Sequence, residues 1–409
     1  FQPVSAGAAE SKIRVAILFQ RFGPYHHARL NAAGRLMSVW GVEACAMEDT
    51  YAWDKVEGAA AFTRVTLTGR DSGDRAWRRE LHRNMWRALD EIKPHVVVVP
   101  GWASADTFSA YLWCAKHDVP SVVMSESTEW DEQRVASKEW IKSRLVRLNS
   151  AGLAGGTPHA DYLGRLGLPR ERIFLGYDIV DNDYFRRQSD EARSRMGSLW
   201  LQPEWPVKYF LASARFVEKK NLFRLIKAYA RYRAAAQNSE AWSLVLLGDG
   251  PLKPALRQLI VELGLESSIH LPGFKQYDEL PVYFGLAGVF VHASTTEQWG
   301  LVVNEAMASG LPVLVSNRCG CAMDLVKDDV NGFTFDPGNE EQLAQLMLKI
   351  SAKDFPLEAF GSASRQMIAS WGPERFAGGL RDAVEMALKN PRPAAGMFDR
   401  LLLKLLLRR

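Results

Sequence analysis

Short apolar runs that alternate with helical segments constrain the fold of this chain most strongly. One series begins at residues 14–19 and includes 96–100, and a second begins at 209–214 and includes 243–247. Runs of this length, rich in Val, Ile and Leu, indicate strands buried on both faces, and alternation with helices favours a parallel sheet. The alternation stops in a polar, Pro-containing linker at 184–205 and then restarts. The sequence therefore predicts an α/β protein with two Rossmann-like domains.

Length and composition agree with a globular protein of two domains. The chain has 409 residues, of which 47% are hydrophobic and 24% are charged, as expected for a soluble fold. A net charge of +4 suits an anionic substrate or membrane surface. No compact Lys/Arg cluster with interleaved aromatic residues occurs, so nucleic acid is not an expected partner.

Targeting and cofactor signals are weak in this sequence. Residues 1–11 are mostly small or polar and are expected to be loose. The first ten residues lack the pattern of a signal peptide. No apolar run reaches the roughly 20 residues of a spanning helix. The four cysteines form no Cys-x-x-Cys pair, which favours packing roles in a reducing, cytoplasmic compartment. No Gly-x-Gly-x-x-Gly follows the first strand, so a dinucleotide cofactor is not expected.

The most informative stretch is 295–316, TTEQWGLVVNEAMASGLPVLVS. It predicts a loop, a helix that begins at Gly300 and ends at Ser309, and a strand. Glu297 and Glu305 are eight residues apart, so a mostly helical stretch would separate them by about 12 Å along its axis. The two carboxylates would then hold the two ends of an elongated ligand, and the free helix N–H groups between them suit a phosphate.

The Glu297-(seven residues)-Glu305 pattern, followed by AMASGLPV at 306–313, resembles the signature of retaining family-4 glycosyltransferases. The resemblance is diffuse before about residue 170 and specific over about 209–338. It implies a GT-B fold, in which two Rossmann-like domains face each other across a cleft. The implied domains are an N-terminal acceptor domain, a C-terminal donor domain, and a C-terminal helix with a basic leucine-rich tail, at 1–183, 184–375 and 376–409.

The resemblance also assigns roles on the donor side. Arg215 and Lys220 correspond to the family's Arg and Lys that hold the diphosphate, and fixed cations stabilise the charge that develops on this leaving group. Asn221 replaces the usual Gly and tolerates the left-handed conformation better than most residues. Glu297 would contact the transferred sugar and Glu305 the ribose. The remaining donor residues are the helix amides near Gly300, Leu301 and Val302, and the glycine turn at Gly248.

The acceptor side is less well specified by sequence. In related enzymes the loop that contains Gly23, His26 and His27 faces the cleft, and Gly23 allows close backbone approach. The family often places a His after the fourth strand, but Glu126 stands there in this chain. Glu126 is a candidate catalytic base, and His26 and His27 are further candidates. For each of these three residues a structural or acceptor-contacting role stays open. His292 fits either a core or a cleft-wall position.

The resemblance predicts a metal-independent glycosyltransferase with no cofactor, a nucleotide-diphosphate sugar as donor and a glycan or lipid-linked acceptor. Uridine is the expected base from family frequency. The alternatives are a GT-B epimerase or phosphorylase, and a non-catalytic glycan-binding relative. Six leucines in the seven positions 401–407, beside basic residues, fit either packing on the N-terminal lobe or peripheral binding to an anionic membrane surface at its inner face.

Overall fold

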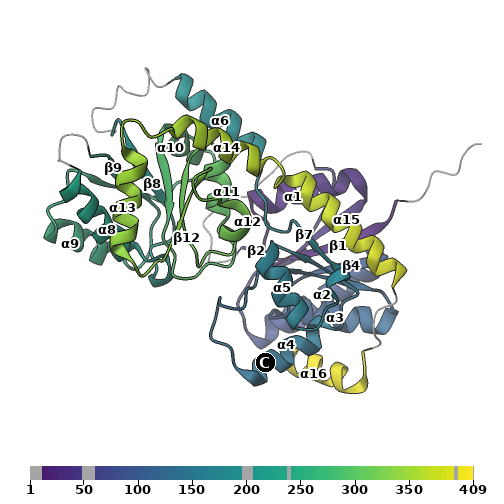
Figure 1. Cartoon of the computed structure of the whole chain (residues 1–409). Coiled ribbons are helices and arrows are strands. Elements are labelled where there is room, and N and C mark those ends of the chain that lie inside the picture. Colours follow the sequence, from purple (N-terminus) through teal and green to yellow (C-terminus); the bar gives the residue numbers. More distant parts are fainter. Residues whose placement is uncertain (1–11, 48–59, 196–205, 237–240, 391–394, 409) are drawn as a thin grey trace, which may run out of the picture.

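The structure is a computed structural model, and it consists of two lobes that are both built on parallel sheets (Figure 1). The expected loose segment at 1–11, part of the linker and Arg409 lie outside the described residues. The residues described are 12–47, 60–195, 206–236, 241–390 and 395–408.

The N-terminal lobe contains a parallel sheet with the order β3-β2-β1-β4-β5-β6-β7 among the described residues. Its strands are β1 Arg14–Phe19, β2 Ser38–Met47, β3 Thr63–Arg70, β4 Val96–Pro100, β5 Ser121–Ser125, β6 Ala151–Ala154 and β7 Ile173–Leu175. Its helices are α1 Pro24–Leu36, α2 Arg75–Ile92, α3 Ala105–His117, α4 Ala136–Val146 and α5 Thr157–Arg165. Buried aliphatic strands between two helical layers give this sheet a core on each face.

The C-terminal lobe contains a second parallel sheet with the order β10-β9-β8-β11-β12-β13 in the described part of the chain. Its strands are β8 Tyr209–Ser213, β9 Ser243–Leu247, β10 Ile269–Gly273, β11 Val289–His292, β12 Val313–Ser316 and β13 Gly332–Phe335. Its helices are α6 Asn182–Ser194, α8 Leu222–Ala235, α9 Lys253–Glu262, α10 Leu280–Leu286, α11 Leu301–Ala308, α12 Ala322–Leu325, α13 Glu340–Ser351 and α14 Leu357–Ile368. The strand order reverses beside β8, as it does beside β1, and ligands of such sheets bind at the carboxyl ends of the strands.

Two strands at one edge of the first sheet were not predicted. β2 and β3 carry polar residues among the apolar ones, and Glu43 in β2 is fully buried. Its carboxylate accepts hydrogen bonds from the Arg64 guanidinium at 2.8 and 3.0 Å and from the Thr66 hydroxyl at 2.6 Å. A buried charge is tolerated because cross-strand partners satisfy it, and those partners are not visible in the sequence pattern of one strand.

The end of the chain crosses back to the N-terminal lobe. α15 Pro373–Lys389 packs on α1, and α16 Met397–Arg408 packs on α3 (Figure 1). On α16, Leu403 is fully buried, whereas Leu401 and Leu405 are 55% and 57% exposed. The expected packing role is therefore confirmed for one face of the tail, and a second apolar face remains on the surface.

The expected domain limits fall in the first turns of two helices. Position 183/184 lies inside α6, which packs on α10 and α11 of the C-terminal lobe, and position 375/376 lies inside α15. α6 therefore belongs with the C-terminal lobe, and α15 belongs with the N-terminal lobe.

Candidate active site between the lobes

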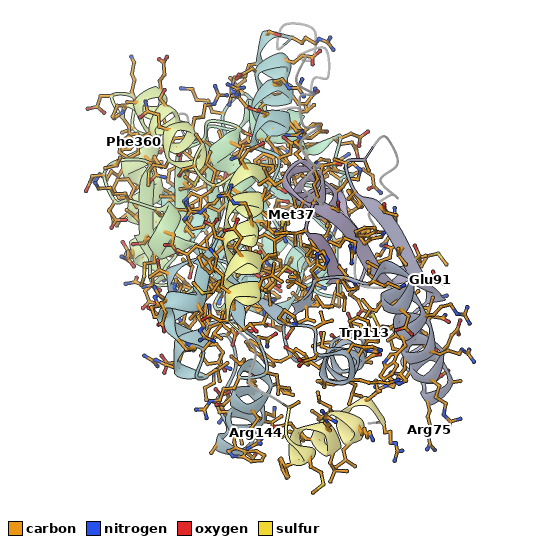
Figure 2. The ribbon with its side chains drawn as sticks, turned by 90° about the vertical axis from the view of Figure 1, so that its right-hand side faces the viewer. Met37, Arg75, Glu91, Trp113, Arg144 and Phe360 are labelled. Atoms are coloured by element: carbon orange, nitrogen blue, oxygen red, sulfur yellow. The ribbon has the colours of Figure 1, made fainter. Side chains whose placement is uncertain are left out.

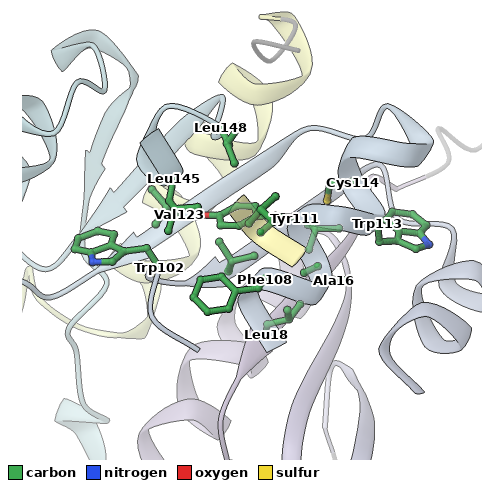
Figure 3. Packing of buried hydrophobic residues seen from close by; sticks show 14 of the residues in the cluster. Ala16, Leu18, Trp102, Phe108, Tyr111, Trp113, Cys114, Val123, Leu145 and Leu148 are labelled. Carbon is green, nitrogen blue, oxygen red and sulfur yellow. The ribbon is translucent and has the colours of Figure 1, made fainter. Parts of the chain in front are cut away.

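A cleft of about 950 Å³ runs between the two lobes. Lys219, Thr296 and Glu297 line it from the C-terminal lobe. The N-terminal wall is mixed, with polar residues near Glu297 and apolar residues farther along, among them Trp77, Trp102, Phe108, Ile141 and Leu145. Figure 3 shows that Trp102, Phe108 and Leu145 belong to the core of this lobe, so the wall is a rigid, packed surface.

Glu297 is the centre of a polar network at the C-terminal wall. Its carboxylate pairs with the Lys220 ammonium and lies 3.7 Å from the Lys219 nitrogen. The Ser294 hydroxyl donates to it at 3.2 Å, and His292 Nε2 lies 3.5 Å away. Burial by itself raises the pKa of Glu297, but the His292 contact and the Lys220 charge lower it overall. Glu297 is therefore an ionised carboxylate held in one position.

His292 is a buried residue of the cleft wall. It lies at the end of β11 and is 2% exposed, and burial lowers its pKa. The neutral imidazole contacts Glu297 and the Ser294 hydroxyl. The structure thus places it behind the carboxylate, where it orients Glu297.

The loop after β8 brings Lys220 to Glu297 through an unusual turn. Asn221 has φ of 58° and ψ of 32°, which confirms the expected left-handed conformation. Its amide donates to the carbonyls of Ala293 and Pro337 at 3.0 and 2.8 Å, so the side chain stabilises a turn that Gly would form by flexibility alone. Arg215 is exposed at the start of this loop.

Gly248 packs against the loop that follows β8. Its φ is +133°, and a Cβ there would lie 1.9 Å from the carbonyl oxygen of Ala214. Because any side chain would push the loop away, only Gly fits where β9 ends beside the Arg215 segment. The glycine turn therefore positions the cationic loop.

The helix after Glu297 has the expected limits. α11 covers Leu301–Ala308, with Gly300 as its left-handed N-cap at φ of +105° and Ser309 as its C-cap. Glu297 lies before it in the predicted loop and pairs by an isolated bridge with Cys319. The left-handed turn at Gly300 keeps Glu297 off the helix axis, so the condition of a mostly helical stretch between the two glutamates is not met. The amides of Leu301 and Val302 still lie in the first turn of the helix, between the two carboxyls in the chain.

Glu305 has an environment opposite to that of Glu297. It is 1% exposed on α11, and burial raises its pKa to about 8 against the hydrogen bond from the Tyr25 hydroxyl. Its second oxygen has no hydrogen-bond partner among the described residues. A buried carboxyl with an unused acceptor oxygen is suited to a ligand hydroxyl, and Tyr25 brings α1 of the other lobe to the same group.

Glu126 follows β5 in the N-terminal lobe, directly before Ser127, which lines the cleft, and Glu126 is half-buried. Burial raises its pKa, Arg29 opposes the rise, and Glu297 adds to it. Arg29 also lies 3.5 Å from the buried Asp178, whose pKa burial and Glu126 both raise. Two carboxyls thus share one guanidinium beside the cleft, and this favours a retained proton on the pair. The sequence motif did not reveal Arg29 or Asp178, because their partnership joins distant segments.

The loop after β1 differs in part from expectation. His26 accepts a hydrogen bond from the Gly23 amide at 3.0 Å and packs on Phe19, and burial together with Arg29 lowers its pKa to about 3. His27 contacts Asn31 at 3.0 Å and lines a second cavity, which α1 shares with residues of α6 and of the 276–278 loop. A Cβ on Gly23 would make only an ordinary contact at 3.8 Å, and its φ of −123° suits any residue. The protein's own packing therefore does not require Gly23, His26 has a local structural role, and His27 does not line the cleft that contains Glu297.

Contacts between the lobes hold the Glu297 loop in place. The Thr157 amide and hydroxyl donate to Asp324 at 2.8 and 2.6 Å, and His159 Nε2 lies 2.8 Å from the carbonyl oxygen of Gln298. A Cβ on Gly320 would lie 1.7 Å from that same oxygen. These residues were not predicted as part of the site. The signal in the sequence was Gly-Gly-Thr-Pro at 155–158, a pattern typical of a helix start.

Two cysteines lie near the cleft, beside the loop that contains Glu297. Cys319 and Cys321 are buried, and burial raises the pKa of both thiols, which agrees with packing roles. Within the described residues, no three His, Cys, Asp or Glu side chains gather as a metal site.

Comparison with known proteins agrees with this geometry. Residues 204–367 match the family model described as glycosyl transferases group 1. The match covers the lobe that carries Lys220, Glu297 and Glu305, and it confirms the resemblance to group 1 glycosyltransferases.

Curated relatives are similar over parts of their length. The chain is 36% identical over 135 residues to the α-monoglucosyldiacylglycerol synthase of Acholeplasma laidlawii, covering 33% of this chain and 32% of the relative. It is 28% identical over 211 residues to a GDP-mannose-dependent α-(1-6)-phosphatidylinositol monomannoside mannosyltransferase of Mycobacterium tuberculosis, covering 50% and 53%. The chain thus spans about a third to about half the length of these relatives.

Solved structures match across both lobes. The Anabaena protein HepE in complex with UDP has a TM-score of 0.69 and 18% identity, covering 91% of this chain and 99% of HepE. Sucrose-phosphate synthase of Thermosynechococcus elongatus has a TM-score of 0.72 and 17% identity, covering 91% and 98%. The fold is GT-B, as the sequence predicted.

Proposed function

We propose that this protein is a retaining glycosyltransferase of the family-4 type, with a nucleotide-diphosphate sugar as donor. The observation that carries the proposal is the pairing of Lys220 with a buried, ionised Glu297, next to the N-terminus of α11 and the buried Glu305. Cations and helix amides suit a diphosphate, and the two carboxyls suit the hydroxyls of sugar and ribose. HepE forms complexes with UDP and UDP-glucose, which favours uridine for this chain.

The proposed reaction is a front-face substitution at the anomeric carbon of the donor sugar. The acceptor oxygen bonds to that carbon on the side where the sugar–phosphate bond breaks, and the nucleotide diphosphate leaves with the bond's electron pair. The acceptor proton passes to the departing phosphate oxygen. Lys220, Arg215 and the amides of Leu301 and Val302 stabilise the leaving charge, and Glu126 binds the acceptor hydroxyl.

A lipid-linked or glycan acceptor is proposed on two grounds. The relatives above are named for diacylglycerol and phosphatidylinositol substrates, and a colanic acid glycosyltransferase from Escherichia coli is 30% identical over 201 residues. In this chain Met397, Leu401 and Leu405 form an exposed apolar stripe on α16 at spacings of four residues. No described helix has the length and apolar character to cross a bilayer. We therefore propose peripheral binding to the inner face of the cell membrane.

A thermal-shift panel with UDP, GDP, ADP and their sugars tests the donor proposal. A ligand at about 100 times its dissociation constant adds roughly 2.7 kcal/mol to the free energy of unfolding. We expect UDP and a UDP-sugar to stabilise the protein and NMR of the product to show a retained anomeric configuration. No stabilisation by any nucleotide would refute the proposal.

An epimerase is the second candidate, and the raised pKa of Glu126 is the observation that favours it. An epimerase needs acids in the cleft that keep a proton near neutral pH. It would convert a nucleotide sugar without an acceptor, whereas a transferase releases free nucleotide diphosphate. A non-catalytic relative would do neither, so product analysis separates all three.

A further inference from the structure

A second groove lies outside the donor cleft, between α2, α3 and α16. Its volume is about 690 Å³, and none of its described lining residues is acidic. Figure 2 shows α16 at the lower edge of the N-terminal lobe, with Arg144 and Arg75 to its two sides. The chain as a whole has 51 basic and 47 acidic residues, so a groove whose described lining is basic and not acidic is a local accumulation of charge. They are Arg75, Arg78, Arg79, Lys116, Arg400, Lys404 and Arg408.

These cations occupy positions that are electrostatically unfavourable. Arg75, Arg78 and Arg79 occupy the first turns of α2. The Asp74 carboxylate caps this helix by accepting from the Trp77 amide, but three cations near one helix N-terminus remain unfavourable. Arg75 and Arg79 are also four residues apart, as are Lys404 and Arg408, and like charges at this spacing repel. A bound anion would relieve both effects.

The groove combines this charge with an apolar floor. Trp86, Leu112 and Leu407 line it, and the Lys116 ammonium lies 5.0 Å from the centre of the Trp86 ring. The Arg400 guanidinium donates to the carbonyl of Ala115 at 3.3 Å. Guanidinium forks match phosphate oxygens, and the floor suits the aliphatic carbon next to a phosphate ester.

The basic groove adjoins the cleft. Arg78 lines both, while Leu406 lines the cleft and the adjacent Leu407 lines the groove. α16 is thus the common wall between them, and one elongated molecule that passes Arg78 would reach both sites.

We propose that the groove between α2 and α16 binds a phosphate group at the lipid end of the acceptor, whose sugar end lies near Glu297 in the cleft. The part that concerns the acceptor rests on the proposed function. The groove supplies the phosphate contacts, and the exposed leucines of α16 lie beside the lipid. This site is distinct from the one proposed for the donor diphosphate at Lys220.

The test compares two double variants of the same helix. Arg75→Ala/Arg79→Ala removes groove cations, and Arg83→Ala/Arg87→Ala removes two exposed arginines of α2 that do not line it. Binding is measured by co-sedimentation with phosphatidic acid vesicles and with neutral phosphatidylcholine vesicles. Pyrophosphate binding is measured by calorimetry with saturating UDP, so that the donor site is occupied.

We expect Arg75→Ala/Arg79→Ala to weaken binding to phosphatidic acid vesicles and to pyrophosphate by about 10- to 30-fold. Each lost cation should lower the affinity by roughly fivefold. The matched variant should change neither by more than about twofold. Equal losses of affinity in both variants would show that only the net charge of the protein matters, and this would overturn the proposal. The absence of vesicle binding in the wild type would overturn it as well. Pyrophosphate binding without vesicle binding would overturn the assignment to a lipid-borne phosphate.

A parallel UDP titration keeps the two proposals separate. Both double variants should bind UDP as the wild type does, because none of the four substituted arginines lines the cleft that contains Glu297. Failure of the wild type to bind UDP would refute the proposed donor, while the groove result would stand on its own.

Discussion

The two walls of the cleft are built in opposite ways. On the C-terminal wall, charged groups are paired and held by residues from separate strands, as Lys220, His292 and Ser294 hold Glu297. The N-terminal wall mixes polar and charged side chains with a packed aromatic and aliphatic surface that includes Trp77 and Trp102. The family model matches the C-terminal lobe. The difference indicates that the C-terminal lobe carries the features shared with the family, whereas the N-terminal lobe carries features particular to this chain.

Lys220→Ala should give the largest loss of turnover, and it changes only the C-terminal wall of the cleft. It removes a cation from the leaving group, and loss of one such contact lowers the rate by about 10²- to 10³-fold. Lys219→Ala is the matched change, since Lys219 is 40% exposed and farther from Glu297, and its effect should be much smaller. UDP release from UDP-glucose measures turnover, and melting curves verify folding. Wild-type turnover in a folded Arg215→Ala/Lys220→Ala variant would contradict the donor assignment.

The two glutamates of the donor wall should separate in a binding experiment. Glu305→Gln should weaken UDP binding by about 10- to 100-fold, as expected for one hydrogen bond to a charged group. Glu297→Gln should leave UDP binding unchanged and impair sugar transfer, because Glu297 contacts the sugar in the proposed complex. Calorimetry with UDP decides this, and equal losses in both variants would remove the division of roles.

The raised pKa of Glu305 predicts a pH dependence on the donor side. In the free protein its carboxyl titrates near pH 8, and a ribose hydroxyl would donate to the ionised form, so binding lowers the pKa. Affinity for UDP should then rise with pH, by at most about tenfold per unit, and level off above pH 8. Calorimetry from pH 6.5 to 9 measures it. A flat wild-type profile, or an unchanged slope in Glu305→Gln, would refute this linkage.

The smallest effect should come from the membrane face of the acceptor lobe. Leu401→Ser/Leu405→Ser should weaken salt-sensitive binding to anionic vesicles by several-fold, because exposed leucines insert at the interface. Val261→Ser/Leu263→Ser, on the exposed face of α9 in the other lobe, is the matched control. These substitutions are sharper than deletion of the tail, which would also remove the buried Leu403. Co-sedimentation that is the same for all three proteins would leave α16 as a packing element only.

Much of this architecture was predictable from local pattern. The limits of β4 agree with the predicted range 96–100, because apolar periodicity reports directly on burial. β2 and β3 were missed, since the buried Glu43 needs partners from another strand. The limits of α11 agree with the predicted helix from Gly300 to Ser309, but the position of the Glu297 side chain depends on the left-handed turn at Gly300.

The sequence by itself determined the two-lobed α/β class, because strand burial is visible in the local order of apolar residues. The 295–316 motif likewise carried the resemblance to group 1 glycosyltransferases. Only the tertiary structure decided which glutamate is ionised. Glu297 meets Lys220 from β8's loop, whereas Glu305 faces apolar packing and Tyr25 of the other lobe. Charge state depends on desolvation and on neighbours across the fold, and neither is a property of the eight residues that separate the two carboxyls.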